Sequence, residues 1–406
     1  NVSAIRVVKA YVREEQETSK LRRASENIYN IFVKAETNLV FNAPMMQTAV
    51  YTCILLVSWF GAKMIASNSL TTGELMSLLT YCMNILMSLM MLSMVFVMIT
   101  MSMASAKRIS EVLNETSDLK NPEHPFMKVE DGSIEFRHVD FAYKKDSDEP
   151  VLEDIDLKIR SGETIGIIGG TGSGKSTLVS LIPRFYDPQE GTVKVNGINA
   201  KDYPQGELCS EIGVVQQRSI LFKGSIRDNL KWGNDQASDE DLWKAIIIAQ
   251  AKDVVEAKPG KLDFEVEQNG RNLSGGQKQR LTIARALVSK PEILILDDSL
   301  SALDFATDAA LRKAIGELEG NVTTFLVSQR ISGIRQADKI LVMEDGELAG
   351  QGTHEELMET CETYQEIYYS QFPEERPAAV KSSKETGKDL DKADKMTEKA
   401  EKGAAE

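Results

Sequence analysis

The sequence predicts two parts in series: an α-helical transmembrane segment and, after it, an α/β domain with a parallel sheet. Three observations predict this order. Two long apolar runs cover residues 39–66 and 75–103. Short β-rich runs then alternate with helical stretches from residue 133 to about residue 370, which is typical of a parallel α/β sheet. A glycine-rich segment, residues 169–176, joins one of the predicted strands to a helix.

The composition limits the classes of protein that fit. The chain has 406 residues, of which 42% are hydrophobic and 27% charged, and its net charge is −14. Binding to nucleic acid needs clustered Lys and Arg, so this acidic balance argues against nucleic acid as the main partner. The four cysteines form no CxxC pair and have no metal-ligand spacing, so we expect neither a disulfide framework nor a zinc site.

The first 38 residues are polar and favour a helix, with basic side chains spread along them. The chain begins at Asn1 inside a helical pattern that has no cap in front of it, and its start does not read as a signal peptide. We therefore expect that the chain is an N-terminally truncated form of a longer protein.

Both apolar runs exceed the roughly 20 residues that cross the core of a bilayer. Residues 75–103 contain no charged side chain, which argues against the alternative of two buried helices in a soluble bundle. Basic residues precede the first run, and Lys107 and Arg108 follow the second, whereas residues 67–73 between them carry none. The positive-inside rule then predicts a hairpin with both outer ends in the cytoplasm.

The second apolar run is rich in methionine. Methionine is flexible and polarisable, so such a helix could line a site for varied apolar ligands. Contact with lipid or ordinary packing explains the same residues, and the sequence leaves these readings open. The methionines are Met76, Met83, Met87, Met90, Met91, Met94, Met98, Met101 and Met103.

Two polar segments flank the predicted α/β domain. A transmembrane region over residues 1–108 gives way to a polar stretch with Pro122 and Pro125, which predicts a linker over residues 109–132. The α/β domain is expected over residues 133–372. Residues 373–406 contain almost no large apolar side chains, so we expect a disordered charged tail.

The glycine-rich segment has the G-x-x-x-x-G-K-S spacing of a phosphate-binding P-loop, with an apolar strand before it and a helix after it. Its glycines let backbone N–H groups point at phosphates, Lys175 reaches the β- and γ-phosphates, and the Ser176 hydroxyl can hold Mg²⁺. ATP with Mg²⁺ is the predicted ligand. The predicted ATP-binding residues here are Gly169, Gly170, Thr171, Gly172, Ser173, Gly174, Lys175, Ser176 and Thr177.

A pair of carboxylates complements the P-loop. Residues 293–296 form an apolar strand that ends in Asp297 and Asp298. Asp297 is predicted to bind Mg²⁺, directly or through water. Asp298 stands where a general base for the attacking water is expected.

Further motifs resemble those of ABC transporters. Residues 273–277 read Leu-Ser-Gly-Gly-Gln, which resembles the signature of that family, and residues 301–304 resemble its D-loop. Tyr143 resembles the aromatic residue that stacks on adenine. Gln217 resembles the Q-loop glutamine, which senses the γ-phosphate and Mg²⁺.

The N-terminal part resembles the transmembrane domain of ABC exporters. Residues 5–15 resemble the end of the fourth transmembrane helix with its coupling helix, and residues 70–75 resemble the turn into the sixth. The resemblance implies the fold class: a partial ABC exporter transmembrane domain followed by an α/β P-loop ABC ATPase domain. It also implies a multi-pass protein of the cell (plasma or inner) membrane, in contact with membrane lipid, whose ATP-binding domain is cytoplasmic.

The resemblance further implies a dimer of ATPase domains. In ABC exporters each ATP lies between the P-loop of one domain and the signature of the other. Ser274, Gly275, Gly276 and Gln277 are therefore expected to contact the ATP of a second exporter half. The implied activity is export of an amphipathic drug or lipid by alternating access, driven by ATP.

Two residues depart from the family pattern at the site of hydrolysis. Asp298 stands where the family usually has Glu, and Gln329 stands where it has a switch histidine. The Asp side chain is one methylene shorter, and Gln cannot carry a proton as imidazole does. We expect Asp298, Gln329 and Gln217 to be the catalytic residues of a slow site, in a heterodimer with a competent partner.

Three alternatives are weighed against this hypothesis. A homodimer with weak turnover at both sites remains open. A soluble ATPase of the same family, acting on DNA or ribosomes, is opposed by the two spans and the acidic charge. A gated channel of the same architecture is distinguished by ion flux after reconstitution, as against ATP-driven efflux.

Overall fold

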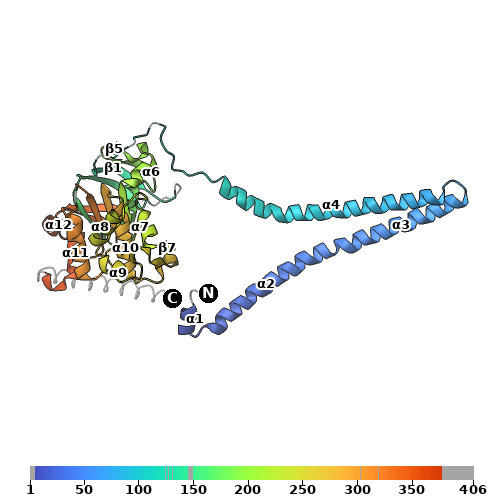
Figure 1. The fold of residues 1–406 in the computed structure, drawn as a ribbon, viewed down its shortest axis with the longest axis horizontal. Helices are drawn as coiled ribbons and strands as arrows, with labels where there is room; N and C mark the ends of the chain where they lie inside the picture. The colour runs from blue at the N-terminus through green and yellow to red at the C-terminus, as the bar shows by residue number, and fades with distance from the viewer. Residues whose placement is uncertain are drawn as a thin grey trace, which may run out of the picture. The chain divides into compact units, whose positions relative to one another are not determined.

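The computed structural model describes residues 5–123, 125–126, 128–129, 131–144, 150–301, 303–318 and 320–376. The chain separates into two compact units, one ending at Ser117 and the other beginning at Asp118 (Figure 1). The described part of the first unit is helical, and the second unit combines sheets with helices.

The first unit contains the helices α1 (Ile5–Ala10), α2 (Glu14–Val40), α3 (Asn42–Ala66) and α4 (Thr72–Leu113). Val12, with a φ of +50°, lies in the break between α1 and α2. Helices α3 and α4 pack side by side and are joined by a short turn, after which Thr71 and Glu74 form a capping box. Gly61 lets these helices approach closely, because a Cβ there would lie 2.2 Å from Leu75 Cδ1.

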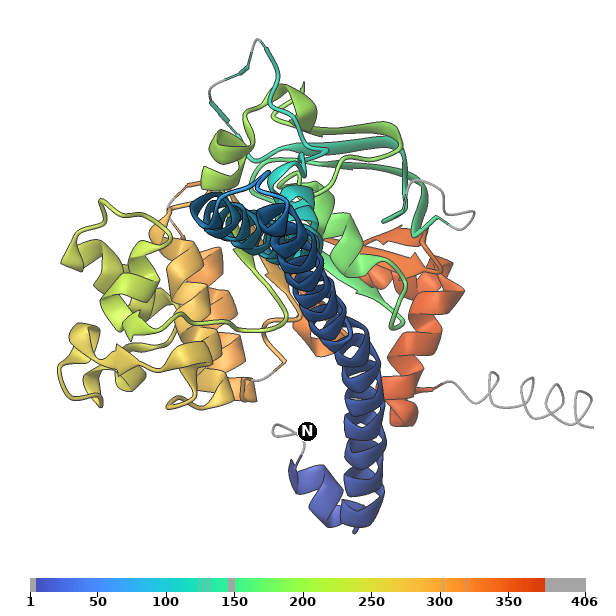
Figure 2. The ribbon, with the colours of Figure 1, turned by 90° about the vertical axis from the view of Figure 1, so that its right-hand side faces the viewer.

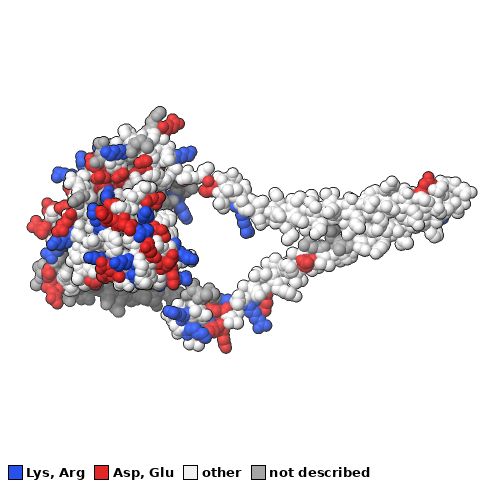
Figure 3. All heavy atoms as spheres, viewed as in Figure 1, with Lys and Arg blue, Asp and Glu red and all other residues white. Residues whose placement is uncertain are grey.

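Helices α3 and α4 expose apolar side chains over most of their length. Leu55, Trp59 and Phe96 are each more than 60% exposed, and so are several methionines of α4. Residues Pro44–Ala66 and Thr72–Leu113 are long and apolar enough to cross a membrane. Figure 3 shows almost no charge along this pair of helices. Such a surface is stable against lipid or further helices rather than against water.

Helix α4 extends beyond the predicted second span of residues 75–103 at both ends. Its 42 residues make it about 60 Å long, so it reaches well beyond a bilayer core of about 30 Å. Residues 109–113, expected in the linker, form its last turn. Of the expected disordered tail, Pro373–Glu375 forms a 3-10 turn. Residues 377–406 lie outside the described residues.

The second unit is built on a six-stranded sheet with the strand order β12-β11-β3-β10-β9-β6. Its strands are parallel except for β12, which pairs with β11 in the antiparallel sense. A four-stranded antiparallel sheet has the order β2-β1-β4-β5, and β7 pairs with β8. The strands are β1 (Ile134–Phe141), β2 (Leu152–Ile159), β3 (Thr164–Gly169), β4 (Glu190–Val195), β5 (Ile198–Asn199), β6 (Ile212–Val215), β7 (Gly224–Ser225), β8 (Glu265–Val266), β9 (Ile293–Asp297), β10 (Thr323–Val327), β11 (Lys339–Glu344) and β12 (Glu347–Gly352).

Helices cover this sheet. In Figure 2 the helices of residues 240–290, coloured yellow to orange, are seen at a distance from the teal strands β1 and β2. They are α5 (Lys175–Leu181), α6 (Gln205–Ser210), α7 (Ile226–Lys231), α8 (Asp239–Ile248), α9 (Lys252–Glu256), α10 (Gly275–Val288), α11 (Phe305–Gly316), α12 (His354–Thr360) and α13 (Glu362–Gln371). Short 3-10 turns cover Ala200–Asp202, Lys261–Asp263, Gln268–Gly270 and Ile331–Gly333.

The central sheet is buried on both faces. On β9, Ile293 and Ile295 belong to a core shared with the antiparallel sheet and α5. Leu294 and Leu296 alternate with them and belong to the second core, against α8, α10 and α11. This alternation explains why the parallel strands are continuous apolar runs in the sequence.

Candidate nucleotide-binding site

Four neighbouring parallel strands, β3, β10, β9 and β6, end at the same edge of the central sheet. The P-loop follows β3, Gln329 lies two residues after β10, Asp298 follows β9, and Gln217 lies two residues after β6. Because parallel strands end together, this order brings residues far apart in the sequence to one edge. The edge is the candidate site.

The P-loop has the backbone conformation that its glycines permit. Gly172 and Gly174 have φ values of +87° and +92°, in the left-handed region that other residues rarely adopt. A Cβ at Gly174 would lie 2.7 Å from Leu152 Cδ2, whereas one at Gly170 or Gly172 would meet nothing within 4 Å. The loop is therefore closely packed at its base and open along its rim, where a phosphate chain could lie.

Lys175 is the charged centre of this loop, and only 9% of it is exposed. Its Nζ donates to the carbonyl oxygen of Gly169 (3.0 Å), to that of Gly170 and to Ser173 Oγ (3.3 Å). Burial lowers the pKa of the ammonium, and the nearby carboxylates oppose this shift. The loop holds the ammonium with neutral oxygens, which phosphate oxygens of higher charge can replace.

The residues predicted to hold Mg²⁺ lie in contact. Ser176 Oγ donates a hydrogen bond of 3.0 Å to Asp297 Oδ1. Burial raises the pKa of the Asp297 carboxyl. The hydrogen bond from Ser176 opposes this rise, and the charge of Asp298 adds to it. A hydroxyl and a carboxylate are oxygen ligands that suit Mg²⁺, which keeps several waters and phosphate oxygens as its other ligands. The residues present fit the ion.

Asp298 and Gln329 line a single cavity of about 310 Å³, together with Ser301, Arg312 and Ser328. Asp298 has a φ of +42°, which is uncommon for a non-glycine residue. Its N–H donates to the Val327 carbonyl (3.0 Å), and its carbonyl accepts from the Ser301 hydroxyl (2.9 Å). Asp298 and Gln329, which are expected to depart from the pattern of ABC exporters, thus share one compartment.

Gln217 contacts this compartment directly. Its Nε2 donates to Asp298 Oδ2 at 3.2 Å. This bond links the loop after β6 to the loop after β9 through the side chain predicted to act as the base. The Asp298 carboxylate, which lies near the P-loop, therefore already accepts a hydrogen bond in this structure.

Gln371, the last residue of α13, was not predicted as part of this region. Its Nε2 donates to the Gln329 carbonyl (2.7 Å), and its Oε1 accepts from the N–H of Ile331 (2.9 Å). One side-chain amide thus holds the backbone on both sides of Arg330. No local pattern marks this glutamine in the sequence, because its partners are about forty residues away.

Tyr143 lies beside the helix of the P-loop. Its hydroxyl is 3.0 Å from Thr177 Oγ1, and its ring packs edge-on against Phe141 and Tyr186, each with 5.1 Å between ring centroids. The residue is 56% exposed, so more than half of it is accessible to a ligand. This position is compatible with the predicted contact with adenine.

Replacing Tyr143 with alanine is expected to weaken ATP binding about tenfold, since stacking of a base on an aromatic ring contributes about 1–3 kcal/mol. Replacing it with phenylalanine removes only the bond to Thr177 and should change the dissociation constant less than threefold, roughly the effect of one exposed hydrogen bond. Titration with a fluorescent ATP analogue measures both. Equal losses in the two variants would show that the hydroxyl, and not the ring, matters.

The signature residues lie at the start of α10 rather than among the P-loop contacts. Ser274 is the N-cap, and its side chain and that of Gln277 form a capping box. Ser274 and Gly275 are exposed, and a Cβ at Gly275 would meet nothing within 4 Å. An exposed N-terminus of a 14-residue helix offers N–H groups to an anion.

The D-loop is described in part. Leu303 is buried, and Asp304 caps α11 by accepting a hydrogen bond of 2.9 Å from the N–H of Thr307. Ala302 lies outside the described residues. Among the described residues, no cluster of three or more His, Cys, Asp or Glu side chains could hold a metal ion.

Comparison with known proteins identifies both units. Residues 152–301 match the family model of ABC transporters, and residues 1–90 match that of the ABC transporter transmembrane region. A solved structure, "Structure of a bacterial Atm1-family ABC exporter with ATP bound", superposes with a TM-score of 0.83 at 30% identity, covering 91% of this chain and 65% of that one.

Curated relatives have the same arrangement. The "ATP-dependent lipid A-core flippase" of Desulfotalea psychrophila is 35% identical over 371 residues, which is 91% of this chain and 64% of the relative. The "Probable multidrug resistance ABC transporter ATP-binding/permease protein YheI" of Bacillus subtilis is 36% identical over 371 residues, 91% of this chain and 63% of the relative. The chain thus spans less than two thirds of the length of these relatives.

A helical transmembrane region followed by a P-loop ATPase domain defines an ABC transporter, and the chain belongs to that family. Its arrangement is that of an ABC exporter and is similar to the Atm1 family. The predicted fold class is confirmed, as is the location: a multi-pass membrane protein whose ATP-binding domain is cytoplasmic. An ABC ATPase domain implies ATP, with Mg²⁺, as its ligand.

Proposed function

We propose that this chain is one subunit of a heterodimeric exporter that couples ATP binding and hydrolysis to the export of a drug or lipid. Its P-loop would hold the phosphates, with Lys175 at the β- and γ-phosphates. Ser176 and Asp297, with Gln217 at the edge of the site, would hold Mg²⁺, which neutralises phosphate charge when bound. Tyr143 would stack on the adenine.

The shared cavity of Asp298 and Gln329 carries this proposal. Hydrolysis needs a base beside the attacking water and a group that senses the γ-phosphate, and these two residues would occupy those positions. The Asp side chain is one methylene shorter than the usual Glu, and a displacement of about 1 Å can cost about 10²-fold in rate. The site of this chain would therefore bind ATP and hydrolyse it slowly.

The exposed start of α10 supports a role for the chain in a partner's site. Ser274, Gly275, Gly276 and Gln277 would face the γ-phosphate held by the P-loop of a second exporter half. An intact signature and an altered hydrolytic pair on one chain suit a dimer with one slow and one fast site. Movement of the two ATPase domains on ATP binding would drive alternating access.

The class of substrate follows from the transmembrane unit and the relatives. The flippase acts on lipid A-core, and YheI is described as a multidrug resistance transporter. The exposed apolar surface of α3 and α4, with its flexible methionines, would suit amphipathic molecules of either kind.

ATP hydrolysis by the whole transporter in nanodiscs tests this proposal. The chain by itself should be slow, and co-expression with a competent exporter half should raise the rate at least about tenfold, as expected when one fast site is completed. A rate typical of exporters for the chain by itself would contradict the heterodimer and favour a homodimer.

Gly275→Asp in this chain tests the role of the signature. The substitution meets open space, and an acidic residue suits the first turn of a helix, so the fold should be retained. Its charge should repel the γ-phosphate of the partner's ATP and lower the hydrolysis rate of the heterodimer at least about tenfold. Gly206→Asp, also in an open first turn of a helix, is the control and should leave the rate unchanged. An unchanged rate in Gly275→Asp would place the signature of this chain outside the fast site.

A further inference from the structure

The segment that follows the helical unit lies against the ATPase domain. We call this segment, residues 118–123 with 125 and 126, the strap. Asn121 Oδ1 accepts a hydrogen bond of 3.1 Å from the N–H of Gln205. The N–H of Phe126 donates to the Asp202 carbonyl (3.0 Å), and its ring lies 6.4 Å from that of Tyr203. The strap is thus attached to residues 202–205, immediately before and at the start of α6.

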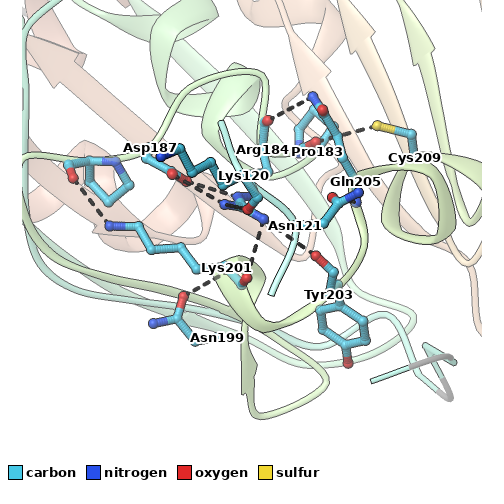
Figure 4. Close-up of polar contacts among 11 residues, drawn as sticks. Lys120, Asn121, Pro183, Arg184, Asp187, Asn199, Lys201, Tyr203, Gln205 and Cys209 are labelled. Carbon is cyan, nitrogen blue, oxygen red and sulfur yellow. Dashed lines mark hydrogen bonds and ion pairs between the residues drawn. The ribbon is translucent and has the colours of Figure 1, made fainter. Parts of the chain in front are cut away.

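Arg184 holds the strap from inside the domain, as Figure 4 shows. Its side chain is only 5% exposed and pairs with Asp187 through Nε (2.9 Å) and a second nitrogen (3.3 Å). The guanidinium also donates to the carbonyl oxygens of Lys201 (3.2 Å), Tyr203 (3.3 Å) and Lys120 (3.0 Å). All five donors of the guanidinium are therefore directed at oxygens, and one of these belongs to the strap.

Arg184 also connects the strap with the P-loop helix. Helix α5 runs from Lys175, at the phosphate loop, to Leu181, and the N–H of Arg184 donates to the Leu181 carbonyl (3.1 Å). The backbone of Arg184 has a φ of +56°, and its carbonyl accepts from Gln205 Nε2 (3.4 Å). A hydrogen-bonded chain, buried at Arg184, thus runs from the P-loop through α5 and Arg184 to the strap.

We propose that Arg184 is a positioning residue that transmits the state of the phosphate loop to the strap. This inference rests on the ATP-driven cycle proposed above. A buried guanidinium with five oxygen contacts is rigid, so movement of α5 on nucleotide binding moves the strap with it. The strap is the part of the ATPase unit nearest in sequence to α4, which places this connection on the route between nucleotide and membrane helix.

Two asparagines that accept similar hydrogen bonds make it possible to distinguish transmission of the nucleotide state from a general loss of stability of the domain. Asn121 Oδ1 accepts one backbone hydrogen bond of 3.1 Å, and Asn199 Oδ1 accepts another of the same length from the N–H of Lys201. Both lie at the loop that Arg184 contacts, but only Asn121 belongs to the strap. Asn121→Ala therefore removes a hydrogen bond that holds the strap. Asn199→Ala removes a hydrogen bond of the same length that holds only the loop beneath the strap.

Amide hydrogen exchange of the whole transporter in nanodiscs, with and without a non-hydrolysable ATP analogue and Mg²⁺, tests the proposal. The analogue should slow exchange at residues 118–126 about threefold or more in the native protein, as a local opening becomes rarer. Asn121→Ala and Arg184→Lys should abolish this response, since a lysine ammonium has three donors against five. Asn199→Ala should keep it.

Kinetics give the second readout. In Asn121→Ala the kcat for ATP should fall several-fold, by about the effect of one lost hydrogen bond, while the KM stays within about twofold. Loss of the exchange response in Asn199→Ala as well, or its retention in Asn121→Ala, would overturn the proposal. The exchange response does not depend on hydrolysis, so an inactive native protein that still shows it would overturn the proposed function and leave this inference standing.

Discussion

Replacing Lys175 with alanine is expected to lower the ATP hydrolysis rate of the chain about 10³-fold, the upper range for removal of one charge-stabilising donor from an active site. The ammonium is buried at the base of the phosphate loop and is held there by neutral oxygens that phosphate can replace. Without it, the charge that would develop on the β- and γ-phosphates would lose the buried ammonium of the P-loop. Binding of ATP should weaken as well, and titration with an ATP analogue measures this alongside hydrolysis.

Lys290→Ala is the matched control for this variant. Lys290 is an exposed lysine that pairs with Asp241 at 2.8 Å. Exposed ion pairs contribute at most about 1 kcal/mol to stability, so its loss should leave hydrolysis unchanged. Thermal unfolding of both variants establishes that the fold is retained. Native affinity for ATP in a well-folded Lys175→Ala variant would contradict the assignment of the P-loop as the phosphate site.

Restoring the usual pair with Asp298→Glu and Gln329→His is expected to raise hydrolysis by the isolated chain about 10²-fold. Glutamate extends the carboxylate by one methylene into the cavity that both side chains line, and histidine supplies a group that can carry a proton. In the proposed heterodimer the same double substitution should change the total rate only modestly, because the partner's site would already dominate it.

Asp298→Asn is the control for the double substitution. Asparagine has almost the same shape as aspartate but cannot act as a base. If Asp298 contributes little to hydrolysis, this variant should lower the rate of the isolated chain only a few-fold, far less than the gain from the double substitution. A fall of about 10²-fold or more would show that Asp298 is an effective base, and the chain would then have a working site of its own.

The parts of the molecule that short stretches of sequence encode were predictable. The helical membrane region followed by an α/β ATPase domain is confirmed, because an uncharged apolar run and alternating strands and helices are local patterns. The P-loop is also local: its glycines, Lys175 and Ser176 lie within one strand–loop–helix segment, and positive φ at Gly172 and Gly174 needs glycine in any context. The roles of these residues in ATP binding remain predictions.

Contacts between distant parts of the chain could not be derived in this way. The order β3-β10-β9-β6 differs from the order along the chain, and it alone brings Gln217, Asp298 and Gln329 to one edge beside the P-loop. The attachment of Gln371 to the backbone of Gln329, and that of Arg184 to the strap, follow from the same packing. A hydrogen-bond partner far away in sequence is chosen by the packing of buried surfaces, which no window of a few residues contains.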